Sequence, residues 1–319
     1  VLAPILKYLI YILKDNNIQF ETNDLYNMVK EDYPNLRLIV NKMEFSIING
    51  VLTPSSYLTS SNKIEEEELL ELISKNNIQI SSLAYYDNNL HSNGAIREKN
   101  IKHLYQVIDT ASILNIKHVG TFTGRDMNLG FEENFKEFKK VFPQIVKYAA
   151  DKNVNILIEN CSMPGWHKEG WGATISYSPE LWDRMFEIIP DKNFGLNFDP
   201  SHLIWLGVDY LKVLKDYKER ILYFHAKDTE IFEDKRSYYS ILGKQLDKES
   251  EWDYGWWKHK IPGNGSIEWR KVFQVLNEIK YDGFVSIEHE DRDYSENDEL
   301  IKEGLIKGKQ FLDSMIINK

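Results

Sequence analysis

The chain has 319 residues, of which 42% are hydrophobic, enough for one large core or two modest ones. A formal charge of −10 and a pI near 5.4 argue against nucleic acid as a partner, because the Lys and Arg clusters that neutralise phosphates are absent. The single cysteine, Cys161, cannot form an internal disulfide and fits a reducing compartment, which predicts a cytoplasmic protein.

The chain begins with an apolar stretch, VLAPILKYLIYIL, which Lys7 interrupts. This stretch is shorter than the ~20 residues that a membrane span needs, and no small-residue cleavage site follows it. We therefore expect a buried helix or strand there, and no membrane partner. The next segments suggest a helix over 23–33, a strand over 36–40 and a helix over 65–76.

From residue 77 onward, short β-branched runs alternate with longer segments of helical period. The predicted strands cover 78–86, 117–122, 154–160, 194–199, 221–227 and 284–289. The predicted helices lie near 95–115, 131–151, 179–189, 207–218, 267–280 and 297–316. Apolar strands that alternate with amphipathic helices predict a parallel sheet covered by helices.

With the strand over 36–40, this pattern gives seven strands. An eighth would come from the first 20 residues or from 44–52, where the signal is weak. No linker, repeat or break in composition divides the chain. We therefore predict an α/β fold with a single domain over 1–319, a (β/α)8 TIM barrel whose first strand is poorly defined. A doubly wound open sheet is the alternative.

Four consecutive predicted strands end in groups that can bind a metal: Glu159, Asp199, His225 and Glu288. Each acid alone could equally be a helix N-cap or a solvated loop residue. Active sites of parallel barrels lie at the carboxyl ends of the strands, so four such groups on neighbouring strands can converge. Three carboxylates and one imidazole predict a site for one divalent metal ion such as Mn, Mg, Co or Zn.

Other polar residues follow the same strands. His202 would contact the substrate over the metal, or it could start a helix and make an ordinary backbone hydrogen bond. The candidates for holding substrate hydroxyls are Arg125, Lys227, Asp228 and Glu290. Alternatively, Lys227 could pair with Asp228 or Glu290 across the rim of the barrel, and Arg125 could anchor a loop carbonyl.

Five tryptophans fall in two predicted loops at the same face, 161–177 and 229–262: Trp166, Trp171, Trp252, Trp256 and Trp257. They suit a lid or a substrate wall, with Trp166 and Trp171 as substrate contacts, or they pack among themselves or at an oligomer contact.

The final loop, EHEDRDYSENDE, is densely acidic, which argues for a substrate without phosphate. The stretch PGNGS (262–266) could offer backbone N–H groups to an anion, but a tight turn into the next helix is the favoured interpretation.

Seven stretches between residues 77 and 316 resemble the xylose isomerase-like barrel superfamily, which includes sugar isomerases, epimerases and type-2 apurinic endonucleases. They are ISSLAYYDNNL, VGTFTGRD, ILIENC, FGLNFDPSHLIWLGVDY, FHAKDTEI, PGNGSIEWRKVF and YDGFVSIEHED. The resemblance to its D-tagatose 3-epimerase-type members implies that Glu159 and Glu288 exchange protons with the substrate and that His202 touches the sugar. Two features depart from that pattern: Ile231 stands where those epimerases carry an arginine, and the first ~60 residues do not match.

Together these observations predict a metal-dependent sugar isomerase or epimerase that moves a proton next to a carbonyl through an enediolate. Its partner would be a small non-phosphorylated sugar or sugar derivative, and a homo-oligomer is left open. The first alternative is a lyase or dehydratase acting on a keto-inositol or an oxidised glycoside with the same metal and glutamate base. A DNA repair enzyme would need more strand-end histidines and a basic surface, and a sugar-binding module would not need two opposed glutamates.

Overall fold

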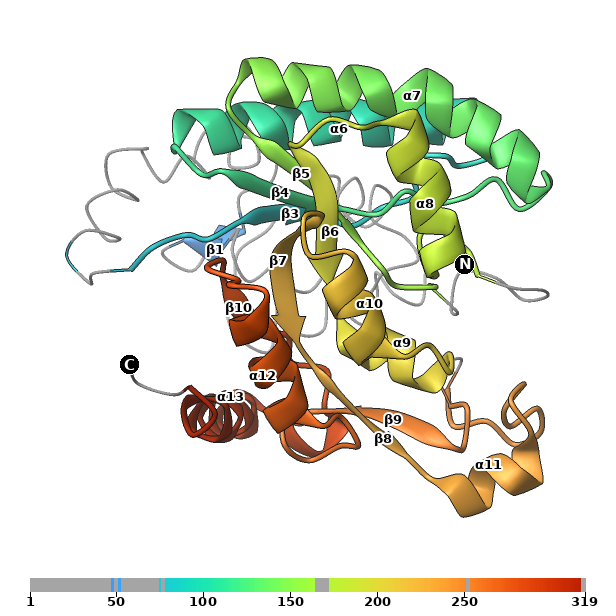
Figure 1. Ribbon diagram of the computed structural model, residues 1–319, viewed down its shortest axis with the longest axis vertical. Coiled ribbons are helices and arrows are strands. Elements are labelled where there is room, and N and C mark those ends of the chain that lie inside the picture. The colour runs from blue at the N-terminus through green and yellow to red at the C-terminus, as the bar shows by residue number, and fades with distance from the viewer. Residues whose placement is uncertain are drawn as a thin grey trace. The chain divides into compact units, whose positions relative to one another are not determined.

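The computed structural model describes residues 47–48, 51–52, 75, 78–163, 172–250 and 253–316 (Figure 1). The chain divides into two compact units, Val1–Gln79 and Ile80–Lys319. In the first unit, strands β1 (Ile47–Ile48) and β2 (Val51–Leu52) pair antiparallel, so the segment 44–52 contains a small hairpin.

Several expectations fall on other parts of the chain. The predicted elements over 1–13, 23–33 and 36–40 lie outside the described residues, as does most of the predicted helix over 65–76. Trp166, Trp171 and Trp252 lie outside them too. The single domain over 1–319 therefore stays a prediction.

The second unit is built on a parallel sheet of six strands, curled into a half-barrel. Its strands are β3 (Leu83–Tyr85), β4 (His118–Thr121), β5 (Asn155–Glu159), β6 (Phe194–Phe198), β7 (Ile221–Ala226) and β10 (Val285–Ile287). They lie in the order β3-β4-β5-β6-β7-β10. The order follows the chain without the reversal that a doubly wound sheet requires, which excludes that alternative for this unit. All six predicted strands and the barrel fold class are confirmed.

Helices cover the outer face of this sheet (Figure 1). They are α6 (Gly94–Ile113), α7 (Phe131–Asp151), α8 (Pro179–Ile188), α10 (Tyr210–Asp216), α12 (Trp269–Glu278) and α13 (Asp298–Asp313). Large side chains such as Phe138, Phe142 and Trp182 are fully buried between helices and strands. Searched across its described residues, the chain contains no helix that is both long and apolar enough for a membrane span.

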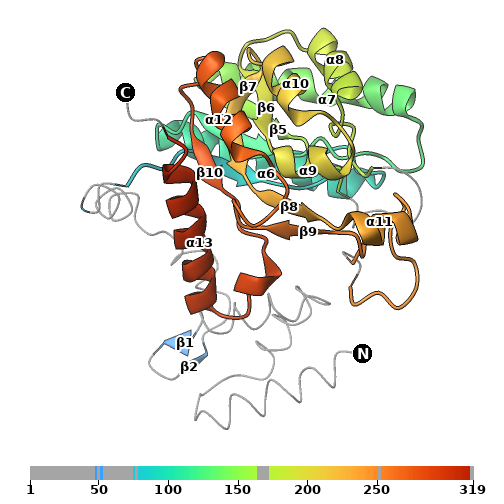
Figure 2. The ribbon, with the colours of Figure 1, turned by 60° about the horizontal axis from the view of Figure 1, so that its bottom comes forward.

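The structure adds elements that the pattern did not predict. A six-residue helix, α9 (Pro200–Trp205), follows β6 directly. The predicted loop over 229–262 contains an antiparallel pair, β8 (Asp228–Ile231) and β9 (Trp257–Lys260), separated by α11 (Glu233–Tyr239). This ribbon extends beyond the carboxyl end of β7 (Figure 2). A 3-10 turn, η2 (Arg292–Tyr294), follows β10.

A register shift in β6 lies just before the site. Leu196 pairs with Ile221 but Asn197 pairs with Tyr223, so β7 carries one extra residue opposite this point. Gly195 permits the close approach, because a Cβ there would lie 2.4 Å from the Arg220 carbonyl oxygen. Such bulges change the direction of the side chains that follow them.

Candidate metal and substrate site

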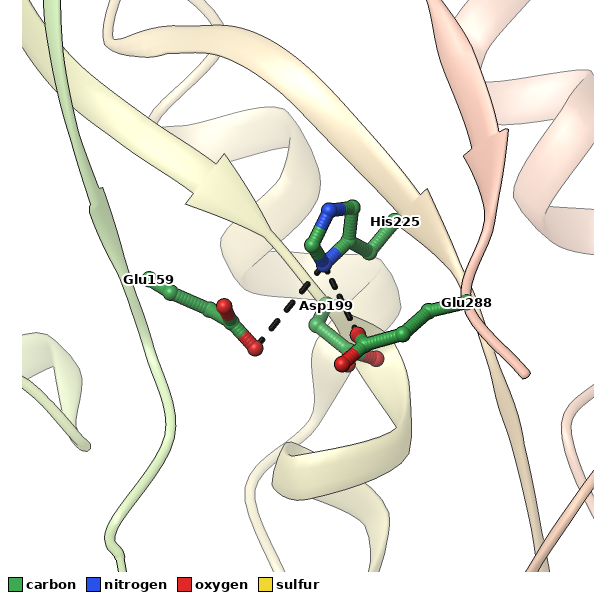
Figure 3. Close-up of side chains that lie close together, drawn as sticks. All are labelled: Glu159, Asp199, His225 and Glu288. Carbon is green, nitrogen blue, oxygen red and sulfur yellow. Dashed lines mark ion pairs between the residues drawn. The ribbon is translucent and has the colours of Figure 1, made fainter. Parts of the chain in front are cut away.

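Four side chains converge at the carboxyl ends of neighbouring strands (Figure 3). Glu159 ends β5, Asp199 follows β6, His225 lies in β7 and Glu288 follows β10. One ligand atom from each lies within 4.8 Å of all the others. Two ligands on opposite sides of a cation at 2.0–2.6 Å lie roughly 4–5 Å apart. The cluster therefore has the size and the donor set to hold one divalent ion, as the strand-end pattern predicted.

Asp199 is held on both sides by the chain. Its backbone N–H donates to Asn160 Oδ1 at 2.7 Å, and Asn160 Nδ2 donates back to the Asp199 carbonyl at 2.8 Å. Its Oδ1 caps α9 by accepting a 2.8 Å hydrogen bond from the Ser201 N–H. This leaves Oδ2 directed to the cluster.

Strong electrostatic coupling links His225 to the glutamates. His225 Nδ1 lies 2.8 Å from Glu288 Oε2 and 3.8 Å from Glu159 Oε1. Burial disfavours the charged ring, but the two carboxylates outweigh it and raise the pKa of His225 to about 10. Burial and the Glu288 charge act to raise the pKa of Glu159, but hydrogen bonds from His202 and His225 prevail and lower it to about 2. Burial also acts to raise the pKa of Glu288, but Lys227 and His225 outweigh it and hold that pKa well below its ordinary value. Both glutamates are thus ionised at neutral pH.

Two carboxylate oxygens show why a cation fits. Asp199 Oδ2 and Glu288 Oε2 are buried and receive no hydrogen bond of normal geometry. Lys227 Nζ lies 3.2 Å and 3.1 Å from them, close enough for attraction but badly aligned. Buried oxygens with unsatisfied lone pairs are costly, and a metal ion would satisfy them.

Lys227, Glu290 and His202 lie beside the cluster. Lys227 is 1% exposed and pairs with Glu290 Oε2 at 2.9 Å, as one interpretation of the sequence predicted. Burial lowers the pKa of Lys227, but the surrounding carboxylates, led by Glu288, hold it well above its ordinary value. His202, on α9, brings Nε2 to 3.3 Å from Asp199 Oδ2 and 3.5 Å from Glu159 Oε1. It therefore contacts the cluster, and its contact with substrate stays a prediction.

Asp228 does not belong to this group of side chains around the cluster. Its carboxylate is fully buried and accepts hydrogen bonds from the N–H groups of Gly263 and Ile267, both at 3.0 Å, and from Trp269 Nε1 at 2.7 Å. It does not line the cavity, so it is a structural anchor rather than a group that faces substrate. It also occupies N–H groups at the PGNGS stretch, and Gly265 is required because a Cβ there would lie 2.2 Å from Asp228 Oδ1. This arrangement agrees with a tight turn and leaves these groups unavailable to phosphate.

Arg125 also has a structural environment. It donates to the carbonyls of Gly172 at 3.2 Å and Leu129 at 3.3 Å. Its guanidinium lies 4.2 Å from the centre of the Phe131 ring. These contacts match the loop-anchoring alternative, and Arg125 is not among the residues that line the cavity.

A cavity of about 540 Å³ opens beside the cluster and is lined by Glu159, His202, Lys227, Glu288 and Glu290. Several further lining residues were missed, among them Tyr86 and His259. Tyr86 ends the strand over 78–86, so the strand-end rule could have found it. His259 lies on β9, in a segment interpreted as loop, and no sequence signal pointed to it.

The described tryptophans of the second predicted loop pack among their neighbours. Trp257 stacks between Trp205, at 4.7 Å between ring centres, and Tyr254, at 5.0 Å. Because both of its faces are covered, Trp257 turns only an edge to the cavity it lines. Trp256 is 2% exposed. These two side chains fit the alternative of a packed aromatic cluster.

Known proteins resemble this chain over much of its length. An inosose dehydratase of Clostridium perfringens is 28% identical over 124 residues, covering 37% of this chain and 38% of the relative. Two solved structures share the fold: IOLI protein with a bound zinc atom (17% identity, TM-score 0.62, 91% and 98% of the two chains) and a D-tagatose 3-epimerase-like protein (20% identity, TM-score 0.55, 82% and 88%). A family model described as xylose isomerase-like TIM barrel matches residues 45–311. The chain therefore belongs to the xylose isomerase-like TIM barrel family, a family of enzymes that includes epimerases and dehydratases.

Proposed function

We propose that the protein is a divalent-metal-dependent isomerase or epimerase of a non-phosphorylated sugar or sugar derivative. The observation that carries this proposal is the convergence of two ionised glutamates, the buried Glu159 and the partly buried Glu288, on one cluster with Asp199 and His225. Similarity to an epimerase-like structure and to a zinc-containing structure supports it.

The proposed chemistry removes a proton from a carbon next to a carbonyl. A divalent ion held by Glu159, Asp199, His225 and Glu288 would stabilise negative charge on the substrate oxygens. Glu159 and Glu288, from the first and last of four neighbouring strands, take and return the proton. The Lys227 ammonium, held among these carboxylates, offers a charge-assisted hydrogen bond to a substrate oxygen.

The charges around the cavity support the proposal that the substrate carries no phosphate. Its lining includes the acidic side chains Glu249, Asp253, Glu290, Asp291 and Asp293. The acidic lining residues outnumber the basic ones, which are Lys227, Lys258, Lys260 and Arg292. Two of these cations are already paired, Lys260 with Asp293 and Lys227 with Glu290. The single buried thiol, Cys161, supports a cytoplasmic location.

A dehydratase is the second candidate, favoured by the resemblance to inosose dehydratases. The same glutamates would remove the proton, and the neighbouring Lys227 and His202 would assist the departing hydroxyl. Product mass separates the two reactions, because isomerisation conserves mass and elimination releases water.

The test is a screen of monosaccharides, keto-sugars and inososes in deuterated water with Mn, Mg, Co or Zn. We expect deuterium at a carbon next to a carbonyl in at least one compound, and loss of this exchange in Glu159→Gln. Glu299→Gln, an exposed change on α13, is the matched control and should exchange normally. Absence of exchange with every compound and metal would overturn the proposal.

A further inference from the structure

The β8–β9 ribbon delivers one more polar side chain to the cavity. His259 lies opposite Thr229 in the antiparallel register and lines the cavity together with Lys227 and Glu290. Its ring packs edge-on against His202, with centres 5.4 Å apart, and against Trp257 at 5.0 Å. Its side chain is 16% exposed, so it is held firmly but still reaches the cavity.

The hydrogen bonds of Thr229 determine where the proton of His259 lies. Thr229 Oγ1 donates to the Ser201 carbonyl at 3.0 Å, which uses its only proton. Thr229 Oγ1 also lies 3.2 Å from His259 Nδ1. The hydroxyl can therefore only accept, and His259 Nδ1 must be the donor. In the neutral ring, Nε2 then carries a lone pair and is an acceptor.

The ring is neutral at physiological pH. Burial, followed by the positive charges of Lys227 and His202, lowers the pKa of His259 well below its ordinary value. His259 Nε2 lies 3.7 Å from Glu290 Oε2, too far for a hydrogen bond between them. The cavity wall thus presents two neighbouring acceptors, His259 Nε2 and the Glu290 carboxylate. Lys227 donates a hydrogen bond to Glu290.

We propose that His259 Nε2 and Glu290 form a hydroxyl-binding subsite that accepts hydrogen bonds from neighbouring hydroxyls of an uncharged polyol. That this polyol is part of the substrate rests on the proposed function. An anionic group is disfavoured there, because Glu290 is itself a carboxylate and acidic side chains outnumber basic ones in the lining of the cavity. A site built to receive a hydroxyl also discriminates against a deoxy analogue, since the partly buried acceptor on His259 is then left unpaired.

The experiment uses polyols that cannot be turned over: xylitol, sorbitol and myo-inositol, titrated calorimetrically into the Mn-loaded protein. For the polyol that binds, we expect His259→Phe to raise Kd by about five-fold or more, the loss of one to two hydrogen bonds. His259→Gln, which restores a side-chain acceptor, should recover part of the affinity. His103→Phe, an exposed change on the outer helix α6, should bind as the unmodified chain does.

Two comparisons on the unmodified protein keep the proposal testable even where His259→Phe does not fold. The monodeoxy analogues of the bound polyol should include one that binds about ten-fold more weakly. Sorbitol 6-phosphate should bind more weakly than sorbitol. Equal affinity across the deoxy series, tighter binding of the phosphate, an unchanged Kd in a folded His259→Phe, or no polyol binding would each overturn the subsite. Because none of these measurements needs turnover, deuterium exchange can fail while the subsite stands, and the reverse.

Discussion

His225 carries a proton at neutral pH in the metal-free protein, because the pKa of its ring is raised to about 10 by Glu159 and Glu288. A metal ion binds only the deprotonated nitrogen, so binding must release this proton. We expect Kd for Mn²⁺ to fall about ten-fold per pH unit between pH 7 and 8.5, as the proton is lost more easily. Electron paramagnetic resonance of free Mn²⁺ measures this dependence. An affinity that stays flat over that range would contradict it, and His225→Gln should reduce the slope.

Asp199 combines two tasks that substitution can separate. Asn at this position keeps an acceptor for the Ser201 N–H and caps a helix as well as Asp does, whereas Ala loses the cap at a cost of about 1 kcal/mol. We expect Asp199→Asn to be more stable to urea than Asp199→Ala by about that amount, while both bind metal much more weakly than the unmodified chain. Equal unfolding midpoints for the two variants would show that the cap is unimportant.

At the scale of elements, the β8–β9 ribbon depends on Asp228. Asp228→Ala would leave the N–H groups of Gly263 and Ile267 and the Trp269 indole without their acceptor, at about 1–3 kcal/mol for each buried donor. We expect the free energy of unfolding to fall by about 3 kcal/mol or more in urea titrations. Asp234→Ala, an exposed change on α11, should alter it by less than about 0.5 kcal/mol. Similar losses in both variants would refute the anchoring role.

The periodicity of apolar residues predicted the alternating strands and helices of the barrel. It missed the short elements outside that alternation. The central strands of the sheet, such as β5 and β6, are apolar runs because both of their faces are buried, and helices such as α7 and α12 bury one apolar side. The strand WKHK of β9 has neither signal, and it lies 25 residues after β8. Helix α9 is only six residues long, too short for a period to show.

The same limit applies to the site. The cluster of Glu159, Asp199, His225 and Glu288 could be predicted because each stands at the end of an apolar run. The orientation of a side chain could not: Asp228 follows Lys227 directly, yet the two carry out separate tasks because alternate residues of an extended chain point to opposite sides. His259 was missed as well, because it lies on the β8–β9 ribbon, which the sequence did not predict.

For the whole molecule, a bound ion would tie together four neighbouring strands of the curled sheet. A ligand that binds only the folded state raises the free energy of unfolding by about 2.7 kcal/mol when its concentration is 100 times Kd. We expect Mn²⁺ to raise the unfolding temperature by several degrees in calorimetry and EDTA to reverse the shift. In Asp199→Asn the shift should largely disappear. A shift of the same size in that variant would locate the ion elsewhere.

The β8–β9 ribbon, which carries His259, follows the end of β7. Asp228 anchors it to the turn before α12. Among the described residues, the hydrogen bonds of Asp228 do not involve the four-residue cluster. The strand that carries His259 therefore has an anchor of its own, although Lys227 connects Glu290 of the proposed subsite to Glu288 of the cluster. Under the proposed function, substitutions on β9 would alter which compound binds while leaving Glu159, Asp199, His225 and Glu288 unchanged. An engineer seeking altered selectivity should diversify that strand first.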